Sequence, residues 1–347
     1  MMDIFSLLSE LVRHWDDTGE VIRLLEQQLK EEGLETTIVG ESAPFLFSRI
    51  GVGEPSLCLF CHIDTTPPYA LSQPFYREEE GKAYGLGVCD KASVVAMIEA
   101  FRKMKGKIER GSVDILITSD SEERGEGLRK VFQEGYSPRW AIIGEPTNLS
   151  VVTEHPGLLL LEIYCYGLST PVSFPLSGIN SIEEMMVFLN DLKERLPFVL
   201  VGMKGGESFL RLPERCHSTI AVPLPLDRDS TWALRILDSV LKNPRWMDVS
   251  YRILRVENPL RAEIFSPLAR LAREVAREIL GYEREISPPG WSEASRFQER
   301  GSEVVVLGAG EPKISHSGEE YVVLEDIVHQ VEIIKGIVSS LFSSKAY

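Results

Sequence analysis

The sequence is short of positive charge. It holds 37 lysine and arginine residues against 52 aspartate and glutamate residues, a formal net charge of −15 over 347 residues, and its basic residues form no long cluster. This balance argues against nucleic acid or an anionic membrane as a partner. No apolar run approaches the ~18 residues of a membrane-spanning helix, and the N-terminal segment MMDIFSLLSE lacks the basic start of a secretory signal. We therefore expect a cytoplasmic protein.

Cysteine is also scarce. The five cysteines are an odd number and are spread through apparent strands, which disfavours a disulfide framework and favours a reducing compartment. Cys58 and Cys61 form a CxxC pattern that would suit a redox or zinc site. Residues three apart on a strand, however, face opposite sides of the sheet. We interpret both as small, buried apolar residues.

The composition, 44% hydrophobic and 26% charged, leaves room for two globular domains. We predict an α/β catalytic domain, a mixed and mostly parallel sheet flanked by helices, made of residues 1–152 and 258–347. Residues 153–257 follow a βαββαβ pattern and are expected to form an inserted α+β, ferredoxin-like lid. We also expect helices at about 92–104, 230–241 and 324–342, and strands near 198–203 and 207–211.

Histidines and carboxylates gather where apolar strands end in turns. SLCLFCHID, VDILITS and WAIIG are near-continuous apolar runs, typical of strands buried on both faces. In an open α/β sheet, side chains at such strand ends line the crevice where ligands bind. Two imidazoles and several carboxylates are the ligands that a pair of zinc-like ions needs. The candidates, in chain order, are His62, Asp64, Asp90, Glu122, Glu123, Glu145 and His316.

These residue types suit a metallohydrolase. Two metal ions about 3.5 to 4 Å apart can share a water, lower its pKa toward roughly 7 and polarise an amide carbonyl. A carboxylate that binds neither ion can take the proton of that water and hand it to the leaving amine. Because neighbouring residues at a strand end project differently, we expect one of Glu122 and Glu123 to bind metal and the other to carry the proton.

At this point the chain resembles the acetylornithine deacetylase, succinyl-diaminopimelate desuccinylase, aminoacylase and carboxypeptidase G group of dinuclear zinc amidohydrolases and peptidases. The resemblance covers nearly the whole length, through CHIDTTPP, YGLGVCDKAS, SEERGEG, GEPT, SGINSI, GWSEASRF and HSGEEYV. It implies two divalent ions, zinc first, with cobalt or manganese as alternatives. By resemblance His62 and Glu145 would hold one ion, Glu123 and His316 the other, and Asp90 would bridge both.

The same resemblance implies how the remaining residues act. Glu122 would be the general base, and Asp64 would orient the metal-binding His62 without binding the metal itself. Trp291 stands in a slot where deacylases often have threonine, which suggests an aromatic wall for a bulky substrate. The family's usual arrangement also implies a homodimer formed through the lid.

The lid departs from the family pattern at three positions. Pro171 stands where relatives carry a histidine that usually reaches across the dimer, and proline cannot donate a hydrogen bond. Leu210 replaces an asparagine, and Pro223 replaces an arginine that grips a substrate carboxylate in relatives. Either the substrate differs or the lid no longer assists catalysis. Residues that could substitute are His155, His217, Arg211, Arg215 and Arg296.

Three functions remain open on this basis. The first is an amide hydrolase that acts on a small N-acyl amino acid. The second is a dipeptidase or aminopeptidase, because DKAS resembles the Asp-Lys-Ala-Gly of tripeptidase-like relatives. The third is a metal-binding scaffold that has lost turnover, which the lid substitutions favour. Glu122 favours the two enzymes, because a scaffold has no need of a base.

Overall fold

The computed structural model describes residues 2–14, 16–66, 75–206 and 208–342. The chain divides into two compact units: unit 1 comprises Met1–His155 and Arg261–Tyr347, and unit 2 comprises Pro156–Leu260. These bounds lie three residues after the 153–257 expected for the insertion. Among the described residues, no helix has the length and apolar content needed to cross a membrane.

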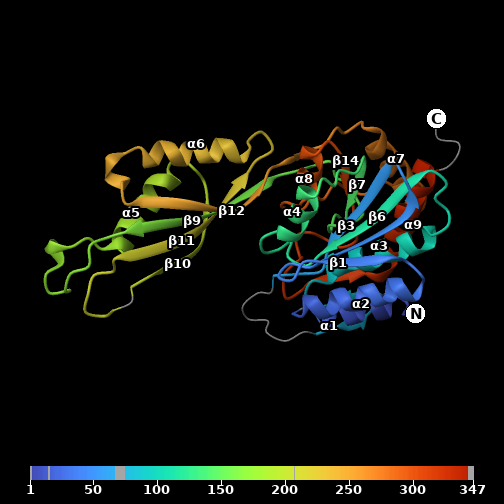
Figure 1. Ribbon diagram of the computed structural model, residues 1–347, viewed down its shortest axis with the longest axis horizontal. Helices are drawn as coiled ribbons and strands as arrows, with labels where there is room; N and C mark the ends of the chain where they lie inside the picture. Colours follow the sequence, from blue (N-terminus) through green and yellow to red (C-terminus); the bar gives the residue numbers. More distant parts are fainter. Residues whose placement is uncertain (1, 15, 67–74, 207, 343–347) are drawn as a thin grey trace. The chain divides into compact units, whose positions relative to one another are not determined.

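Unit 1 is built on a six-stranded sheet (Figure 1). Three of its five pairings, β6 with β3, β3 with β7 and β7 with β14, are parallel, while β1 with β2 and β2 with β6 are antiparallel. This confirms the predicted mixed, mostly parallel sheet. In sheet order the strands are β1 (Thr36–Val39), β2 (Phe45–Val52), β6 (Gly111–Thr118), β3 (Ser56–His62), β7 (Trp140–Ile143) and β14 (Glu303–Val306).

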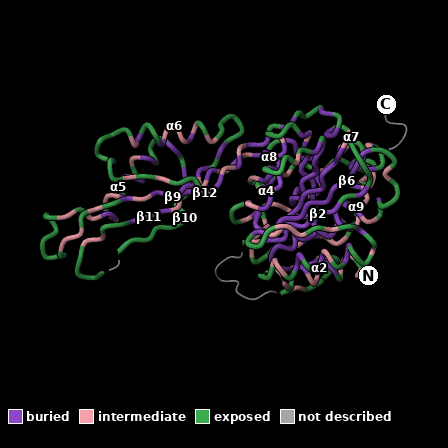
Figure 2. The backbone as a smooth tube through the Cα atoms, viewed as in Figure 1, coloured by how far each residue is buried: buried purple, intermediate pink, exposed green. Residues whose placement is uncertain are grey.

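Apolar side chains on both faces of this sheet explain why helices cover it. β3, β6 and β7 are buried along their whole length, and Figure 2 shows the buried segments concentrated there. Leu59 and Cys61 pack into the main core, whereas Phe60 lies 5.3 Å, ring to ring, from Phe297 on the other face. The helices are α1 (Ile4–Arg13), α2 (Thr18–Glu31), α3 (Val88–Met104), α4 (Glu126–Gln133), α7 (Pro267–Leu280), α8 (Ala294–Glu299) and α9 (Leu324–Phe342).

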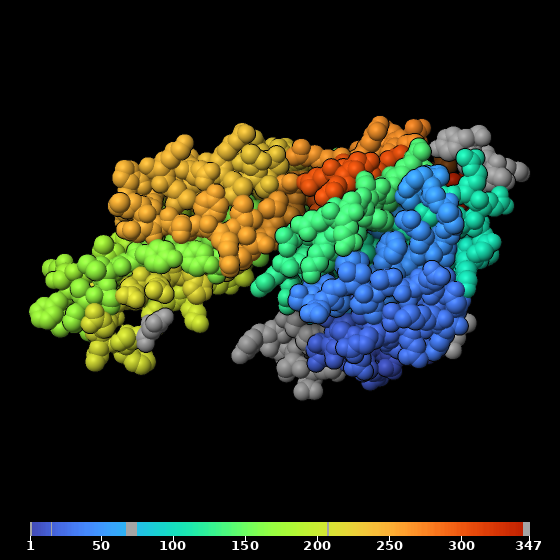
Figure 3. Space-filling model, in the orientation of Figure 1, coloured from blue at the N-terminus to red at the C-terminus, as the bar shows by residue number. Residues whose placement is uncertain are grey.

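Helices far apart in the sequence meet on this sheet. α3 packs against α9 and α1. On the Phe60 face, α4 lies beside α8, as Figures 1 and 3 both show, and Phe132 contacts Phe297 edge to face. A small sheet joins β4 (Arg77–Glu79), β5 (Lys82–Tyr84) and β15 (Tyr321–Val323), and β8 (Glu154–His155) and β13 (Leu260–Arg261) flank the insertion.

Unit 2 has its own antiparallel sheet, in the order β10-β11-β9-β12, and its own apolar core. The βαββαβ succession with this strand order is ferredoxin-like, as predicted. Its inward residues alternate along β9 and β11, so one sheet face packs against the two helices. The elements are β9 (Gly157–Tyr166), η1 (Pro175–Ser177), α5 (Ser181–Lys193), β10 (Val199–Gly205), β11 (Arg215–Leu224), α6 (Ser230–Leu241), η2 (Pro244–Trp246) and β12 (Val249–Glu257).

Two expected elements differ from the structure. α3 begins at Val88 rather than near residue 92, so Asp90 lies in the first helical turn and not in a turn before it. The strand expected at 207–211 does not form over 208–211, and Glu207 lies outside the described residues. Instead, the backbone around Leu210 and Arg211 bonds to residues 170–172.

Candidate metal centre

The ends of two parallel strands bring an imidazole and a carboxylate together. His62 is the last residue of β3, and Glu145 follows two residues after β7, its neighbour in the sheet. A 2.8 Å hydrogen bond from the Gly144 amide to the Phe60 carbonyl continues the pairing of the two strands as far as the residue before Glu145. His62 Nε2 therefore lies 3.4 Å from Glu145 Oε1. The sheet topology places both side chains at one edge, as strand ends in open α/β sheets do.

Asp90 completes a group of three. One ligand atom from each of His62, Asp90 and Glu145 lies within 4.8 Å of the others, and all three residues are buried. Both Asp90 oxygens are buried without a hydrogen-bond partner among the described residues. A buried carboxylate left in that state is costly unless a cation compensates it. The donor set of one imidazole and two carboxylates fits a divalent ion such as zinc.

His316 and Glu122 extend this group on one side. His316 Nδ1 lies 3.1 Å from the Thr65 hydroxyl and 4.0 Å from Asp90 Oδ2, while its Nε2 lies 3.6 Å from Glu122 Oε1. The same Glu122 oxygen is 3.9 Å from His62 Nε2. The Glu122 carboxylate thus lies between the two imidazoles, and its other oxygen accepts a hydrogen bond from Thr66.

Asp64 supports both sides of the centre. Its Oδ1 lies 3.3 Å from His62 Nδ1, so the imidazole can direct Nε2 toward Glu145. Its two oxygens also accept hydrogen bonds from the backbone amides of Ser121 and Glu122, at 3.0 and 2.6 Å. The side chain therefore ties the end of β3 to the loop after β6.

Glu123 lies apart from this cluster. Its side chain is exposed, and among the described residues it makes no hydrogen bond or ion pair. The structure thus brings Glu122, and not Glu123, next to His316. For Glu123 to bind an ion as the resemblance implies, its side chain must turn inward when the ion enters.

Burial and close charges shift the pKa values of the cluster. Burial raises the pKa of Glu145 to about 7 and raises that of Glu122, in both cases against the lowering charge of His62. For His62, burial lowers the pKa, but the charges of Glu145 and Asp64 outweigh it and the pKa ends well above its usual value. For Asp64, burial raises the pKa, but the hydrogen bond with His62 and the two amides bring it below the usual value.

Two further buried charged groups border the centre, and neither was among the sequence candidates. Lys91 is fully buried, and its Nζ has no hydrogen-bond partner among the described residues. Burial lowers the pKa of Lys91, opposed by the charges of Asp90 and Glu320. Glu320 is 1% exposed, and burial raises the pKa of its carboxyl. No local pattern distinguishes Glu320 from Glu319 beside it, so sequence reasoning had no signal to select it.

The candidate substrate residues of unit 1 lie around the Glu122 loop and the start of α8. The Arg296 guanidinium donates a 2.8 Å hydrogen bond to the carbonyl of Gly125, two residues after Glu123. His155 Nε2 lies 2.8 Å from the Ser292 hydroxyl in a fully buried contact. Trp291, beside Ser292, is half-buried. Arg296 thus supports the loop that carries Glu122.

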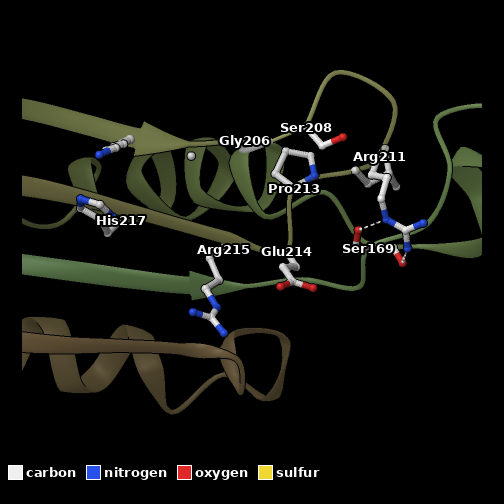
Figure 4. Close-up of a pocket in the computed structure, with 11 residues that line it drawn as sticks. Ser169, Gly206, Ser208, Arg211, Pro213, Glu214, Arg215 and His217 are labelled. Atoms are coloured by element: carbon white, nitrogen blue, oxygen red, sulfur yellow. Dashed lines mark hydrogen bonds between the residues drawn. The ribbon is translucent and has the colours of Figure 1, made fainter.

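The remaining candidates, His217, Arg211 and Arg215, belong to unit 2. They line a pocket of about 460 Å³ together with Lys204, and Glu214 is the acidic residue of that lining (Figure 4). The Arg211 guanidinium turns to Ser169, donating to its hydroxyl at 3.1 Å and to its carbonyl at 3.2 Å. All three family departures, Pro171, Leu210 and Pro223, are exposed.

Comparison with known proteins shows a family match over most of the chain and similarity to two named hydrolases. The model of Peptidase family M20/M25/M40 matches residues 58–340. A probable succinyl-diaminopimelate desuccinylase of Staphylococcus epidermidis is 22% identical, with 96% of each chain covered. An acetylornithine deacetylase of Aliivibrio salmonicida is 27% identical over 95% of this chain and 93% of its own.

A solved structure agrees on the fold. A dinuclear metal-binding peptidase of the M20 family from Bacillus subtilis aligns with a TM-score of 0.69 at 15% identity, covering 98% of this chain and 97% of its own. Because the family match begins within β3, before His62, and ends within α9, after His316, it spans the entire candidate centre. The chain belongs to Peptidase family M20/M25/M40 and, like its named relatives, is a metal-dependent hydrolase of carbon–nitrogen bonds.

Proposed function

We propose that the protein hydrolyses the amide bond of a small N-acyl amino acid, with Glu122 as general base. The observation that carries this proposal is the position of the Glu122 carboxylate between His62 and His316, with Asp64 holding its backbone. A relative named acetylornithine deacetylase and another named desuccinylase support the substrate class.

Five residues would hold two divalent ions: His62 and Glu145 for one, Glu123 and His316 for the other, and Asp90 between them. The orphaned, buried oxygens of Asp90 favour this arrangement, because a bridging carboxylate needs both. We propose zinc as the ion, with cobalt or manganese as alternatives that the same nitrogen and oxygen ligands accept. When bound, the ions supply a water of lowered pKa and polarise the amide carbonyl.

The residues of the chain then supply the proton transfers. The Glu122 carboxylate takes a proton from the attacking water and passes it to the nitrogen of the leaving amine, so that the acid and the amino acid separate as products. Burial raises the pKa of Glu122, which makes it a better proton acceptor than an exposed glutamate. Asp64 keeps both His62 and the Glu122 backbone in place during this exchange.

Two alternatives remain as proposals. A dipeptidase or aminopeptidase would use the same residues, and the likeness to a dinuclear metal-binding peptidase supports it. A scaffold without turnover is favoured by Pro171 and Pro223, but the position of the Glu122 carboxylate between His62 and His316 argues for a working base. Initial rates on acetylated and succinylated amino acids and on dipeptides, each with Zn²⁺, Co²⁺ or Mn²⁺, discriminate among the three. Turnover of none of them would contradict the enzyme proposals.

We also propose a homodimer formed through unit 2, in the cytoplasm. β10 is an edge strand that pairs with β11, and its apolar residues face solvent, with Val199 58% and Val201 61% exposed. An exposed, apolar edge strand is a template for pairing with a second chain. The cytoplasmic assignment is supported by the five cysteines, which are all buried as free thiols.

A further inference from the structure

Glu320 joins two segments that each carry a candidate metal ligand. Its Oε2 accepts hydrogen bonds from the backbone amides of Gly87, 2.9 Å, and His316, 3.0 Å. Its Oε1 accepts a third from the Cys89 amide, 3.0 Å. The carboxylate is buried, so three N–H groups take the place of water around it.

The first of these segments is the start of α3. Gly87 is the N-cap of this helix and has no side chain that could accept a hydrogen bond from the first turn. Glu320 supplies that acceptor from 233 residues away, at the position where helix N-termini favour negative charge. Asp90 directly follows Cys89, so the bonds to Gly87 and Cys89 set where the Asp90 carboxylate stands.

The second segment is the loop of His316. This residue has a φ of +60°, a left-handed backbone conformation that residues other than glycine rarely adopt. Such a conformation persists only where surrounding contacts enforce it. The bond from the His316 amide to Glu320 is one such contact, and the Thr65 hydroxyl near Nδ1 is another.

We propose that Glu320 is a positioning residue that fixes the spacing between Asp90 and His316, and through it the site of the second ion. This inference rests on the proposed function and deepens it, because it names the group that shapes one of the two ion sites. The ion between His62 and Glu145 shares Asp90, but its other two ligands stand at the ends of β3 and β7 and not on the segments that Glu320 joins. Loss of the Glu320 contacts therefore weakens the second ion, which depends on both segments, more than the first.

The test compares Glu320→Gln with Glu319→Gln, a matched control in the exposed neighbour. Glutamine offers a single acceptor oxygen, and its NH₂ group would face at least one of the three amide donors. Stepwise affinities for Zn²⁺ are measured by chelator competition, and the Co²⁺ absorption spectrum reports ligand geometry. We expect E320Q to bind its second ion ~10- to 100-fold more weakly, with a smaller loss for the first ion. E319Q should match the wild type in both.

The outcomes separate this inference from the proposed function. A wild-type chain that binds fewer than two ions would overturn both. Two ions bound by E320Q with wild-type affinities, or equal weakening of both ions, would overturn the role of Glu320 alone. If E320Q does not fold, Glu320→Asp takes its place: it keeps the charge but is one methylene too short to reach both segments. We expect the same selective loss, and a wild-type second affinity in E320D would overturn the inference.

Discussion

The Asp64 carboxylate accepts a 2.6 Å hydrogen bond from the backbone amide of Glu122, while its other oxygen lies 3.3 Å from His62 Nδ1. One side chain thus orients a candidate metal ligand and also holds the candidate base. The position of Glu122 is therefore coupled to that of His62. The two residues are 60 positions apart in the sequence, at the end of β3 and in the loop after β6.

Asp64→Asn should disturb both partners at once. The amide has one acceptor oxygen, so the His62 contact and the two backbone amides can no longer all be satisfied. We expect zinc affinity to fall ~10- to 100-fold and turnover to remain low even at saturating zinc, because Glu122 is displaced as well. Chelator competition and steady-state rates measure the two effects. Full recovery of turnover at high zinc would show that Asp64 acts on the ligand alone; Asp227→Asn, an exposed carboxylate of unit 2, is the control.

Glu122→Gln should retain the metal and the fold but lose most of the activity. The change keeps the shape of the side chain and removes its capacity to accept a proton. General acid–base catalysis contributes ~10² to 10⁴ in rate, and we expect a loss of that size in kcat. Metal content by mass spectrometry and kcat on the best substrate test this, with the exposed Glu134→Gln as control. Wild-type turnover in E122Q would rule Glu122 out as the base.

Glu123→Gln addresses the one candidate ligand that lies outside the cluster. If its side chain turns inward to share an ion with His316, the variant should bind the second zinc ion at least ~10-fold more weakly than the wild type does. Titration with a competing chelator gives this affinity directly. Two ions held at wild-type strength would rule Glu123 out as a ligand and would leave Glu122, 3.6 Å from His316 Nε2, as the carboxylate beside that histidine.

Metal affinity should fall with decreasing pH. Zinc binds the ionised form of Glu145, whose pKa burial raises to about 7. Above pH 7 this group is ionised and no longer affects binding. Below pH 7 a proton competes with the ion, so affinity should drop by up to ~10-fold per pH unit from this residue alone. Competition experiments between pH 5.5 and 8.5 should show that slope, and Glu145→Gln should make it shallower. A flat profile from pH 6 to 8 would contradict the shift.

Charges on the edge strand of unit 2 should separate the proposed dimer. Val199→Lys with Met203→Lys places two ammonium groups on the exposed strand β10, where they repel a second copy. Because Pro171 cannot reach a substrate as a histidine would, we expect the monomer to lose stability more than turnover. Light scattering, thermal unfolding and kcat per site measure this, with Val52→Lys, 89% exposed in unit 1, as control. A fall in kcat of well over ~10²-fold in a folded monomer would show that a lid residue, with His217 the first to test, completes the site of the partner.

Elements whose signals are local were predictable from the sequence. α6 occupies Ser230–Leu241, as expected, because Asp229 directly before it accepts a hydrogen bond from the Trp232 amide. The start of α3 lies four residues before the expected one, because no residue next to it in the sequence caps the helix. Gly87 has no side chain to accept a hydrogen bond, and the acceptor, Glu320, comes from the far end of the chain. Likewise the strand expected at 207–211 fails because its backbone finds partners near Pro171 instead of in the hairpin.

The same distinction applies to the candidate centre. Strand ends and residue types identified His62, Asp90 and Glu145 as candidates, and parallel pairing of β3 with β7 explains why two of them meet. Which of Glu122 and Glu123 turns inward depends on the loop between β6 and α4. That loop is held by Asp64 and Arg296, two contacts that adjacent glutamates in a sequence do not reveal.

Because unit 2 is inserted into unit 1, the residues of the candidate centre are translated in two stages. Glu145 precedes the insertion and His316 follows it, with roughly 170 residues between them, which a ribosome takes on the order of 9 to 34 s to translate. During that interval the nascent chain holds His62, Asp90 and Glu145 but has neither the second histidine nor the Glu320 carboxylate. The candidate centre can therefore be completed only after translation has passed Glu320, when unit 2 has already been made.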